Sequence, residues 1–150
     1  MKAILELLIP VLIHVESGGD VNAIGDMGEA VGCLQIHEIM VDDVNRIAEK
    51  FGYICHHTEE YVYSEYSYDD RYSRYKSTQM CEYYLNYYYD KYVEWYYKRT
   101  IEQRKHKTSP LDVYEVCARL WNGGYEGLKR NPKPTDKYWS KVLRILKTAP

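Results

Sequence analysis

The sequence lacks an excess of charge of either sign. Its 150 residues carry 20 lysines and arginines against 22 aspartates and glutamates, a formal net charge of −2 at pH 7. Proteins dedicated to nucleic-acid binding usually carry a strong basic excess. The balance therefore argues against that class, and the net charge gives no support to electrostatic docking on anionic membranes or cell walls. The apolar share of 45 % and charged share of 28 % are typical of a globular chain, and the length suits one domain.

Cysteines at metal-binding or redox spacing are missing as well. The four cysteines are Cys33, Cys55, Cys81 and Cys117. They are widely spaced and form no Cys-x-x-Cys pair, so neither a zinc knuckle nor a redox motif is indicated. Each lies in an apolar stretch, where a thiol packs as a small hydrophobe, and we expect free thiols rather than two disulfides. His56-His57 has no further ligands at zinc spacing, and no phosphate-binding glycine loop occurs. We expect no metal and no cofactor.

No apolar run is long enough to span a bilayer. The N-terminal run, MKAILELLIPVLIHV, resembles a signal peptide, but Glu6 interrupts it and no small-residue cleavage site follows. We therefore interpret it as a buried helix of the mature protein and expect no membrane insertion. Phenylalanine is almost absent too, with one Phe against 18 Tyr. Tyrosine hydroxyls must stay hydrated or bonded, so this bias favours half-buried aromatic surface.

Hydrophobic periodicity predicts a mainly α fold, a single domain over residues 1–150. A glycine-rich loop with a short hairpin is expected at residues 18–38, and strand alternation is missing outside residues 24–38. A capping box at Ser109-Pro110-Leu111-Asp112 predicts the start of one helix, and Gly123-Gly124 its end. The other helices are expected at residues 2–17, 39–51, 76–105 and 136–147.

Glu16 ends the first predicted helix and is followed by Ser17-Gly18-Gly19. On a helical wheel it falls on the side of Leu5, Ile9 and Leu12. We expect a partly desolvated carboxyl there, with a pKa raised toward neutrality. An acid still protonated near the working pH can donate a proton to a leaving oxygen. The plain alternative is a solvated glutamate, but its charge is unfavourable near the negative end of the helix dipole.

Three further segments carry polar or aromatic side chains that suit a ligand. Gln35, in Gly32-Cys33-Leu34-Gln35, offers both a donor and acceptors. Trp121-Asn122-Gly123-Gly124 can present an aromatic face and an amide to a sugar. Tyr138, in TDKYWSKVL, has a hydroxyl that can reach a carboxyl. Taken singly, an ordinary turn, a helix C-cap and helix packing explain these segments as well.

The order of these four segments resembles the lysozyme-like superfamily of soluble lytic transglycosylases and goose-type lysozymes. That family is known by a Glu-Ser pair, a Gly-Leu-x-Gln-like segment, an Ala-Tyr-Asn-x-Gly-like segment and a tyrosine in a closing helix. Here the segments read HVESGGD, GCLQI, ARLWNGG and TDKYWSKVL, from residue 14 to about 143. GCLQ replaces the commoner Gly-Leu-Met-Gln, and Trp121 replaces the usual Tyr. The stretch GDMGEAVGCLQIHEIMVDDVNRI resembles a small phage and bacterial branch.

The resemblance implies a lysozyme-like domain in which the hairpin region lines a glycan cleft. It implies peptidoglycan as the substrate, cut at the β-1,4 bond from N-acetylmuramic acid to N-acetylglucosamine. Glu16 falls at the position of the general acid, and Tyr138 at that of the tyrosine that orients it. The remaining expected substrate-binding residues are Ser17, Gln35, Trp121 and Asn122. We expect a monomer, made without a signal peptide, that acts on the wall after release, as in phage lysis or a virion.

The resemblance leaves two outcomes open for the reaction. In lytic transglycosylases one glutamic acid is enough, because the 2-acetamido oxygen of the substrate stabilises C1 and the 6-hydroxyl closes a 1,6-anhydro ring. Hydrolysis needs a carboxylate that activates water, for which Asp26 is the better candidate and Glu29 the other. A non-catalytic glycan-binding or structural protein, for instance in a phage tail, is an alternative. A further hypothesis is that Tyr66, Tyr68, Tyr72 and Tyr75 stack on sugar rings.

Overall fold

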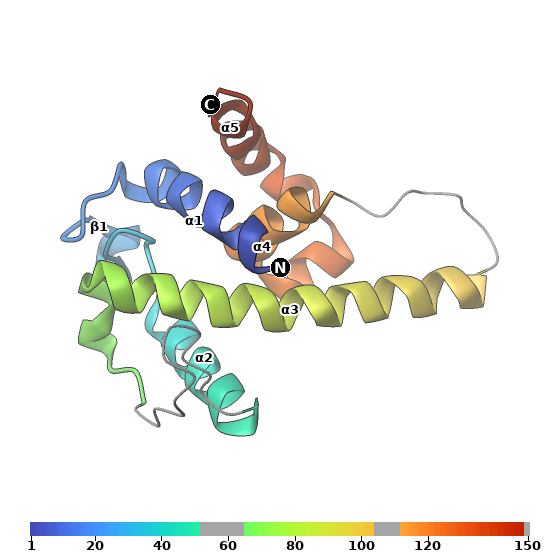
Figure 1. The fold of residues 1–150 in the computed structure, drawn as a ribbon, viewed down its shortest axis with the longest axis horizontal. Helices are drawn as coiled ribbons and strands as arrows, with labels where there is room; N and C mark the ends of the chain where they lie inside the picture. Colours follow the sequence, from blue (N-terminus) through green and yellow to red (C-terminus); the bar gives the residue numbers. More distant parts are fainter. Residues whose placement is uncertain (52–64, 104–111, 149–150) are drawn as a thin grey trace. The chain divides into compact units, whose positions relative to one another are not determined.

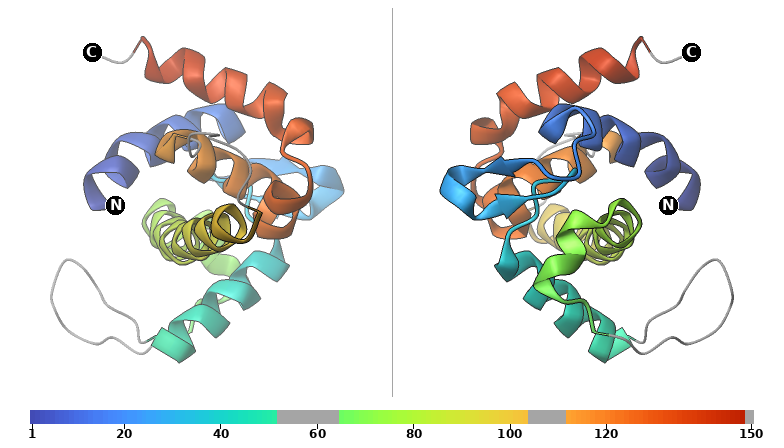
Figure 2. Two further views of the ribbon diagram at one scale, coloured as in Figure 1. Left: turned by 90° about the vertical axis from the view of Figure 1, so that its right-hand side faces the viewer. Right: turned by 90° about the vertical axis from the view of Figure 1, so that its left-hand side faces the viewer.

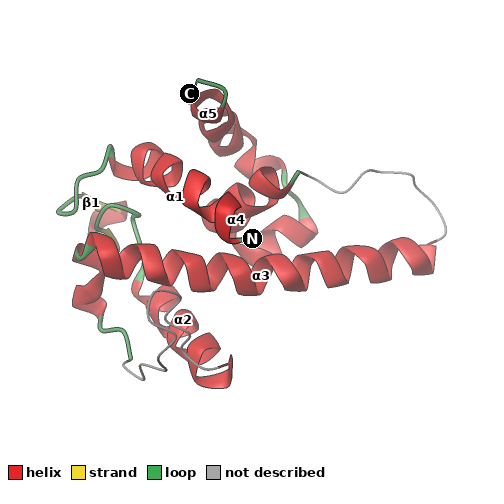
Figure 3. Ribbon diagram, viewed as in Figure 1, coloured by secondary structure: helices red, strands yellow, loops and turns green. Residues whose placement is uncertain are grey.

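The computed structural model describes residues 1–51, 65–103 and 112–148, and these are mainly helical (Figures 1 and 3). The α-helices are α1 (Lys2–Ser17), α2 (Glu38–Phe51), α3 (Arg74–Gln103), α4 (Val113–Arg130) and α5 (Asp136–Leu146). Three short 3-10 helices are η1 (Asp26–Gly28), η2 (Tyr68–Tyr72) and η3 (Lys133–Thr135). The mainly α prediction is confirmed. None of the described helices combines the length and the apolar character needed to cross a membrane.

The chain divides into two compact units, one made of Met1–Leu12 with Leu85–Pro150 and the other of Ile13–Tyr84. The boundaries fall inside α1 and inside α3, so each of these helices belongs to both units. The single domain expected from the sequence stays a prediction. Each unit is described by itself below.

Helix α1 buries the face that its sequence pattern predicts. Leu5, Leu8, Ile9 and Leu12 follow helical spacing and are at most 3 % exposed. Leu7 belongs to the same apolar run but is 62 % exposed, because the buried arc is narrower than that run. The helix extends to Ser17 and therefore carries Glu16 in its last turn.

In the unit Ile13–Tyr84 the expected hairpin is present as a minimal antiparallel pair. Strand β1 (Ile24–Gly25) pairs with β2 (Ala30–Val31), and Val31 also bridges Ile36. Helix α2 follows and buries Val41, Val44, Ile47 and Ala48 at helical spacing. The hairpin's Val31 and Ile36 are buried as well, so the core of this unit includes the turn that contains Gln35.

Helix α3 is the longest element, with 30 residues, and Figure 2 views it nearly along its axis. At a rise of 1.5 Å per residue it measures about 45 Å. It starts two residues before the predicted 76–105 helix, and residues 104 and 105 lie outside the described ranges. Its buried side chains include Met80, Cys81, Leu85 and Tyr92.

Helix α4 differs from its prediction at both ends. It begins at Val113, with Asp112 as N-cap accepting a hydrogen bond from the Tyr114 N–H at 2.9 Å, so the start predicted at Ser109 was wrong. Asp112 is itself the cap, and Ser109 lies outside the described residues. The predicted stop at Gly123-Gly124 is a kink: Gly124 has φ 68° and ψ 169°, and helical structure then resumes to Arg130.

Candidate functional site

The Glu16-Ser17 pair contacts the GCLQ segment directly. The Ser17 hydroxyl donates a hydrogen bond to the Cys33 carbonyl at 2.9 Å and accepts one from the Gly19 N–H at 3.1 Å. Glu16 is half-buried in the last turn of α1. Ser17 was expected to bind substrate, but the bonds of its hydroxyl connect the end of α1 to the segment that carries Gln35. This links two of the four sequence motifs inside one unit.

Gln35 supports the hairpin loop from within. Its Nε2 donates to the Ala23 carbonyl at 3.2 Å and to the Gly32 carbonyl at 2.9 Å. An amide nitrogen has two hydrogens, so both are used by the backbone. Gln35 has a φ of 51°, in the left-handed region. Gln35 was expected to bind a sugar. Its N–H groups are bonded to the backbone, and its Oε1 is the atom that can accept a hydrogen bond from a sugar hydroxyl.

The first glycine of GCLQ is needed for a close approach of backbone to backbone. A Cβ on Gly32 would lie 1.9 Å from the Arg71 carbonyl oxygen, and its φ is +79°. Gly32 therefore lets the turn before Gln35 pack against η2. The close neighbour of Gly32 is therefore the chain itself, which agrees with the ordinary turn that the sequence also allowed for this segment.

Arg71 was missed by the sequence analysis, although it holds this region together. Its side chain is 8 % exposed and donates from Nε to the Tyr68 carbonyl at 2.7 Å. Nη1 reaches the Glu29 and Ile36 carbonyls, each at 3.3 Å, and Nη2 reaches Glu38 Oε1 at 3.1 Å. A buried charge is tolerated when it is paired and hydrogen-bonded. The guanidinium therefore fixes the two ends of the segment 29–36.

The two candidate carboxylates for hydrolysis, Asp26 and Glu29, lie beside one imidazole. His37 Nε2 is 3.5 Å from Asp26 Oδ2, and His37 Nδ1 is 3.8 Å from Glu29 Oε2. Among the described residues these three form the group whose ligand atoms, all within 4.8 Å of one another, could hold a metal ion. The two carboxylates face different nitrogens of the imidazole ring, whereas a single metal ion would bind only one ring nitrogen. The arrangement therefore resembles an ion-pair cluster more than the ligand set of one metal ion.

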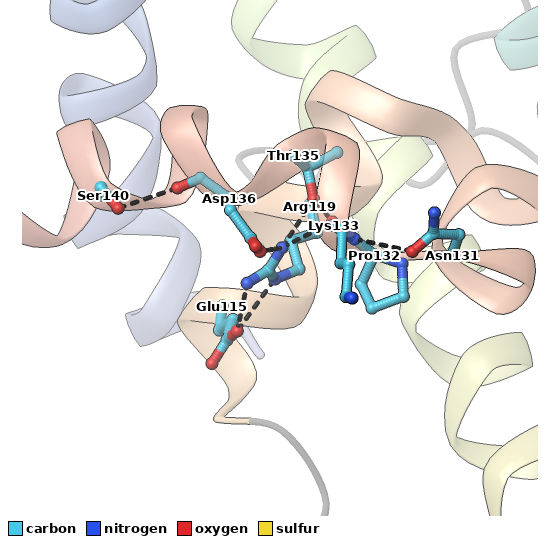
Figure 4. Close-up of polar contacts among 8 residues, drawn as sticks. All are labelled: Glu115, Arg119, Asn131, Pro132, Lys133, Thr135, Asp136 and Ser140. Carbon is cyan, nitrogen blue, oxygen red and sulfur yellow. Dashed lines mark hydrogen bonds and ion pairs between the residues drawn. The ribbon is translucent and has the colours of Figure 1, made fainter.

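In the other unit, Arg119 lies on α4 two residues before the WNGG motif and bonds to the segment Pro132–Asp136, which precedes Tyr138 in the sequence (Figure 4 shows these bonds). Its Nη1 donates to the Pro132 carbonyl and Thr135 Oγ1, both at 2.8 Å, and to Asp136 Oδ1 at 2.7 Å. Its Nε donates to Glu115 at 2.8 Å. Burial lowers the pKa of Arg119, but the bonds to Asp136 and Glu115 outweigh this and raise it.

Gly123 brings the same two segments close together. A Cβ at this position would lie 2.6 Å from Thr135 Cγ2, so a larger residue would push η3 away from α4. The side chains of the WNGG motif differ in solvent exposure. Trp121 is 6 % exposed, which leaves little of its ring for a sugar, whereas Asn122 is exposed. Tyr138 is buried.

The predicted site residues therefore fall into two groups. Glu16, Ser17, Asp26 and Gln35 belong to the unit Ile13–Tyr84, whereas Trp121, Asn122 and Tyr138 belong to the unit that includes Leu85–Pro150. In the first group, the side chains of Ser17 and Gln35 both donate hydrogen bonds to backbone carbonyls of the loop over residues 23–33. Within the second, Arg119 and Gly123 connect the two motif-bearing segments.

The cysteines that the structure describes lie in the interior of the protein. Cys33, Cys81 and Cys117 are buried, and Cys33 and Cys117 are free thiols, as expected; Cys55 lies outside the described residues. Burial raises the pKa of the Cys117 thiol to about 12.

The hypothesis of sugar stacking between residues 66 and 75 fits only part of the tyrosines. Tyr66 is buried and its backbone N–H donates to Asn45 Oδ1 at 2.9 Å, so its ring is no platform for a sugar. Tyr68, Tyr72 and Tyr75 are exposed, which stacking requires.

Comparison with known proteins adds no relative. No family model, curated protein or solved structure matches the chain.

Proposed function

We propose that the protein cleaves peptidoglycan at the β-1,4 bond from N-acetylmuramic acid to N-acetylglucosamine, with Glu16 as general acid and then base. The observation that supports this most is the 2.9 Å bond from Ser17 to Cys33, which joins the Glu-Ser pair to the GCLQ segment. Glu16, the residue before Ser17, has a half-buried side chain in the last turn of α1. Two motifs distant in sequence are thus combined around an ionisable group that can transfer a proton.

The proposed reaction begins with a proton on Glu16. Glu16 gives this proton to the glycosidic oxygen as the bond to C1 breaks, and the leaving sugar takes it as a hydroxyl. The 2-acetamido oxygen of the substrate stabilises C1. The Glu16 carboxylate then removes the proton from the 6-hydroxyl, which closes the 1,6-anhydro ring and returns Glu16 to its starting state. No second carboxylate is required.

The hydrolytic variant replaces the 6-hydroxyl by water and needs a base for it. Asp26 is the candidate, and its side chain is 59 % exposed beside His37. Asp26→Asn separates the two routes. Under anhydro formation the substitution leaves the rate nearly unchanged, whereas under hydrolysis it lowers the rate by about a hundredfold. Mass spectrometry of the released sugars gives a second readout, an anhydro end or a reducing end.

The experiment that tests the function compares wild type, Glu16→Gln and Glu6→Gln on purified sacculi in a zymogram. Glu6 is an exposed glutamate on the same helix and serves as the matched control. We expect clearing by wild type and Glu6→Gln, and a loss of at least about a hundredfold in Glu16→Gln. Full activity in Glu16→Gln would exclude the mechanism. Wall binding without clearing by wild type would favour the non-catalytic glycan binder. If wild type clears the sacculi, we expect the enzyme to act on the wall after release from the producing cell.

A further inference from the structure

Aromatic and cationic side chains alternate along one stripe of α3. Tyr87, Lys91, Trp95 and Arg99 follow one another at four-residue intervals, which places them on the same face of the helix. Lys91 Nζ lies 4.5 Å from the centre of the Tyr87 ring, and the Arg99 guanidinium lies 5.3 Å from the Trp95 ring. Each cation is therefore held over an aromatic face.

Helix α4 extends this stripe from the side. The Tyr125 ring lies 5.4 Å from that of Tyr88, and its hydroxyl donates to the Lys91 carbonyl at 3.4 Å. Lys129 Nζ lies 4.6 Å from the Tyr125 ring and 5.9 Å from the Trp95 ring. We call this set the aromatic–cationic surface. Its members, all in the unit that includes Leu85–Pro150, are Tyr87, Tyr88, Lys91, Trp95, Arg99, Tyr125 and Lys129.

We propose that the aromatic–cationic surface binds carboxylate-bearing glycan strands of the cell wall, using residues other than those proposed for cleavage. The ring faces that the cations do not cover stack on the C–H faces of pyranose rings, and the ammonium and guanidinium groups pair with carboxylates of the lactyl and peptide substituents. From residue 87 to residue 99 the stripe measures about 18 Å, enough for several sugar rings. The choice of this polymer rests on the proposed function.

The charge pattern favours a sparsely charged glycan over a nucleic acid. Acidic side chains stand among the cations: Glu126 pairs with Lys129 at 3.1 Å, and Glu94 pairs with Lys98. Both glutamates are exposed. A nucleic acid carries a phosphate at every nucleotide and would meet these carboxylates as well as the cations. A glycan strand alternates neutral rings with isolated carboxylates, which matches the alternation along α3.

The test measures sedimentation with insoluble sacculi in a Glu16→Gln background, so that cleavage does not consume the ligand. Lys91→Glu with Arg99→Glu reverses two exposed cations of the surface. Lys137→Glu with Lys141→Glu makes the same charge change on exposed positions of α5 and is the matched control. We expect the first pair to weaken wall binding by about fivefold or more, and the control pair to leave it within about twofold. Equal effects of the two pairs would overturn the proposal.

A second arm separates stacking from charge. Tyr125→Ser should weaken binding both to sacculi and to neutral N-acetylglucosamine oligomers, whereas the charge reversals should affect sacculi alone. Tyr97→Ser, which removes an exposed tyrosine of α3 outside the aromatic–cationic surface, is the control. Tighter binding to single-stranded oligonucleotides than to sacculi, or a concentration-dependent dimer lost in the charge-reversed variant, would overturn the proposal. If wild type binds through this surface but clears no sacculi, the cleavage proposal fails and this one stands.

Discussion

Gly32 and Gly123 lie where another part of the chain passes too close for any side chain. At Gly32 the neighbour is a carbonyl oxygen of η2, and at Gly123 it is the methyl group of Thr135. The two glycines belong to the motifs that carry the resemblance to lysozyme-like enzymes. Their conformational role explains why those motifs contain glycine at these points, independently of any ligand.

Gly32→Ala should lower the free energy of unfolding by about 3 kcal/mol, because a positive φ and a backbone collision act together. Gly28→Ala is the control, since Gly28 has a φ of +101° but no atom within 4 Å of an added Cβ. It should cost about 1 kcal/mol. Urea denaturation measures both values. Equal costs would mean that the contact with Arg71 does not constrain the loop.

Cys117 should be inert to thiol reagents in the folded protein. Burial raises its pKa to about 12, and the nearby Asp112 adds to this. At pH 8 only about one thiol in ten thousand is then ionised, and the thiolate is the reactive form. In a Cys55→Ser variant, Ellman's reagent should therefore react with buried thiols only after urea is added. Rapid reaction of Cys117 without denaturant would contradict this.

At the scale of elements, two buried arginines connect segments that share little backbone pairing. Arg71 joins η2 to the hairpin and to the start of α2, and Arg119 joins α4 to η3 and α5. Each satisfies several acceptors at once, and a guanidinium with five donors is suited to that task. The short elements around them depend on these side chains for their positions.

Arg119→Met should lower the free energy of unfolding by about 3 kcal/mol, because it removes the shared donor and leaves Glu115 and Thr135 without it. Arg119→Lys should recover only part of the loss, since an ammonium cannot reach all these acceptors in the same geometry. Lys129→Met breaks an ion pair with the exposed Glu126 and serves as the control, with a change of at most about 1 kcal/mol. Similar losses in the Met variants, measured by urea denaturation, would show that Arg119 has no special role.

The elements differ in how well the sequence predicts them, and the reason is the range of the interactions. Helices such as α1 and α2 have apolar periodicity within a few turns, so their bounds follow closely from the sequence. The start of α4 was misplaced because the sequence pattern was assigned to Ser109 as the cap, whereas Asp112 is the residue whose side chain accepts the backbone N–H. Arg71 could not be found, since its Glu29 and Ile36 partners lie 42 and 35 residues away.

At the scale of the whole molecule, the residues that the resemblance assigns to the site are divided between the two units. Glu16 and Gln35 lie in one, and Asn122 and Tyr138 in the other. The resemblance named these residues as site residues, and that assignment stays a prediction. The sequence did not predict that Ser17, Gln35 and Arg119 hold these segments by hydrogen bonds, because hydrogen-bond partners leave no periodic signal.

Asn122→Ala should lower lysis of sacculi by about tenfold or more while leaving the unfolding midpoint unchanged, because Asn122 is exposed and the resemblance assigns it to the glycan. Asn22→Ala, at an exposed position of the other unit, is the control. Turbidity loss of a sacculus suspension and thermal unfolding measure the two quantities. Unchanged lysis would remove the WNGG motif from the catalytic machinery and leave it with a structural role.

The position of Arg71 has a consequence for the order of folding. Two strands of two residues each are too short to persist alone in water. The side chain that clamps their loop follows Glu29 by 42 residues. Closing so long a loop costs entropy before any contact compensates for it, which slows the step. We expect the hairpin to gain its native order late, after helical segments have formed, so that protection of its amides from hydrogen exchange develops last.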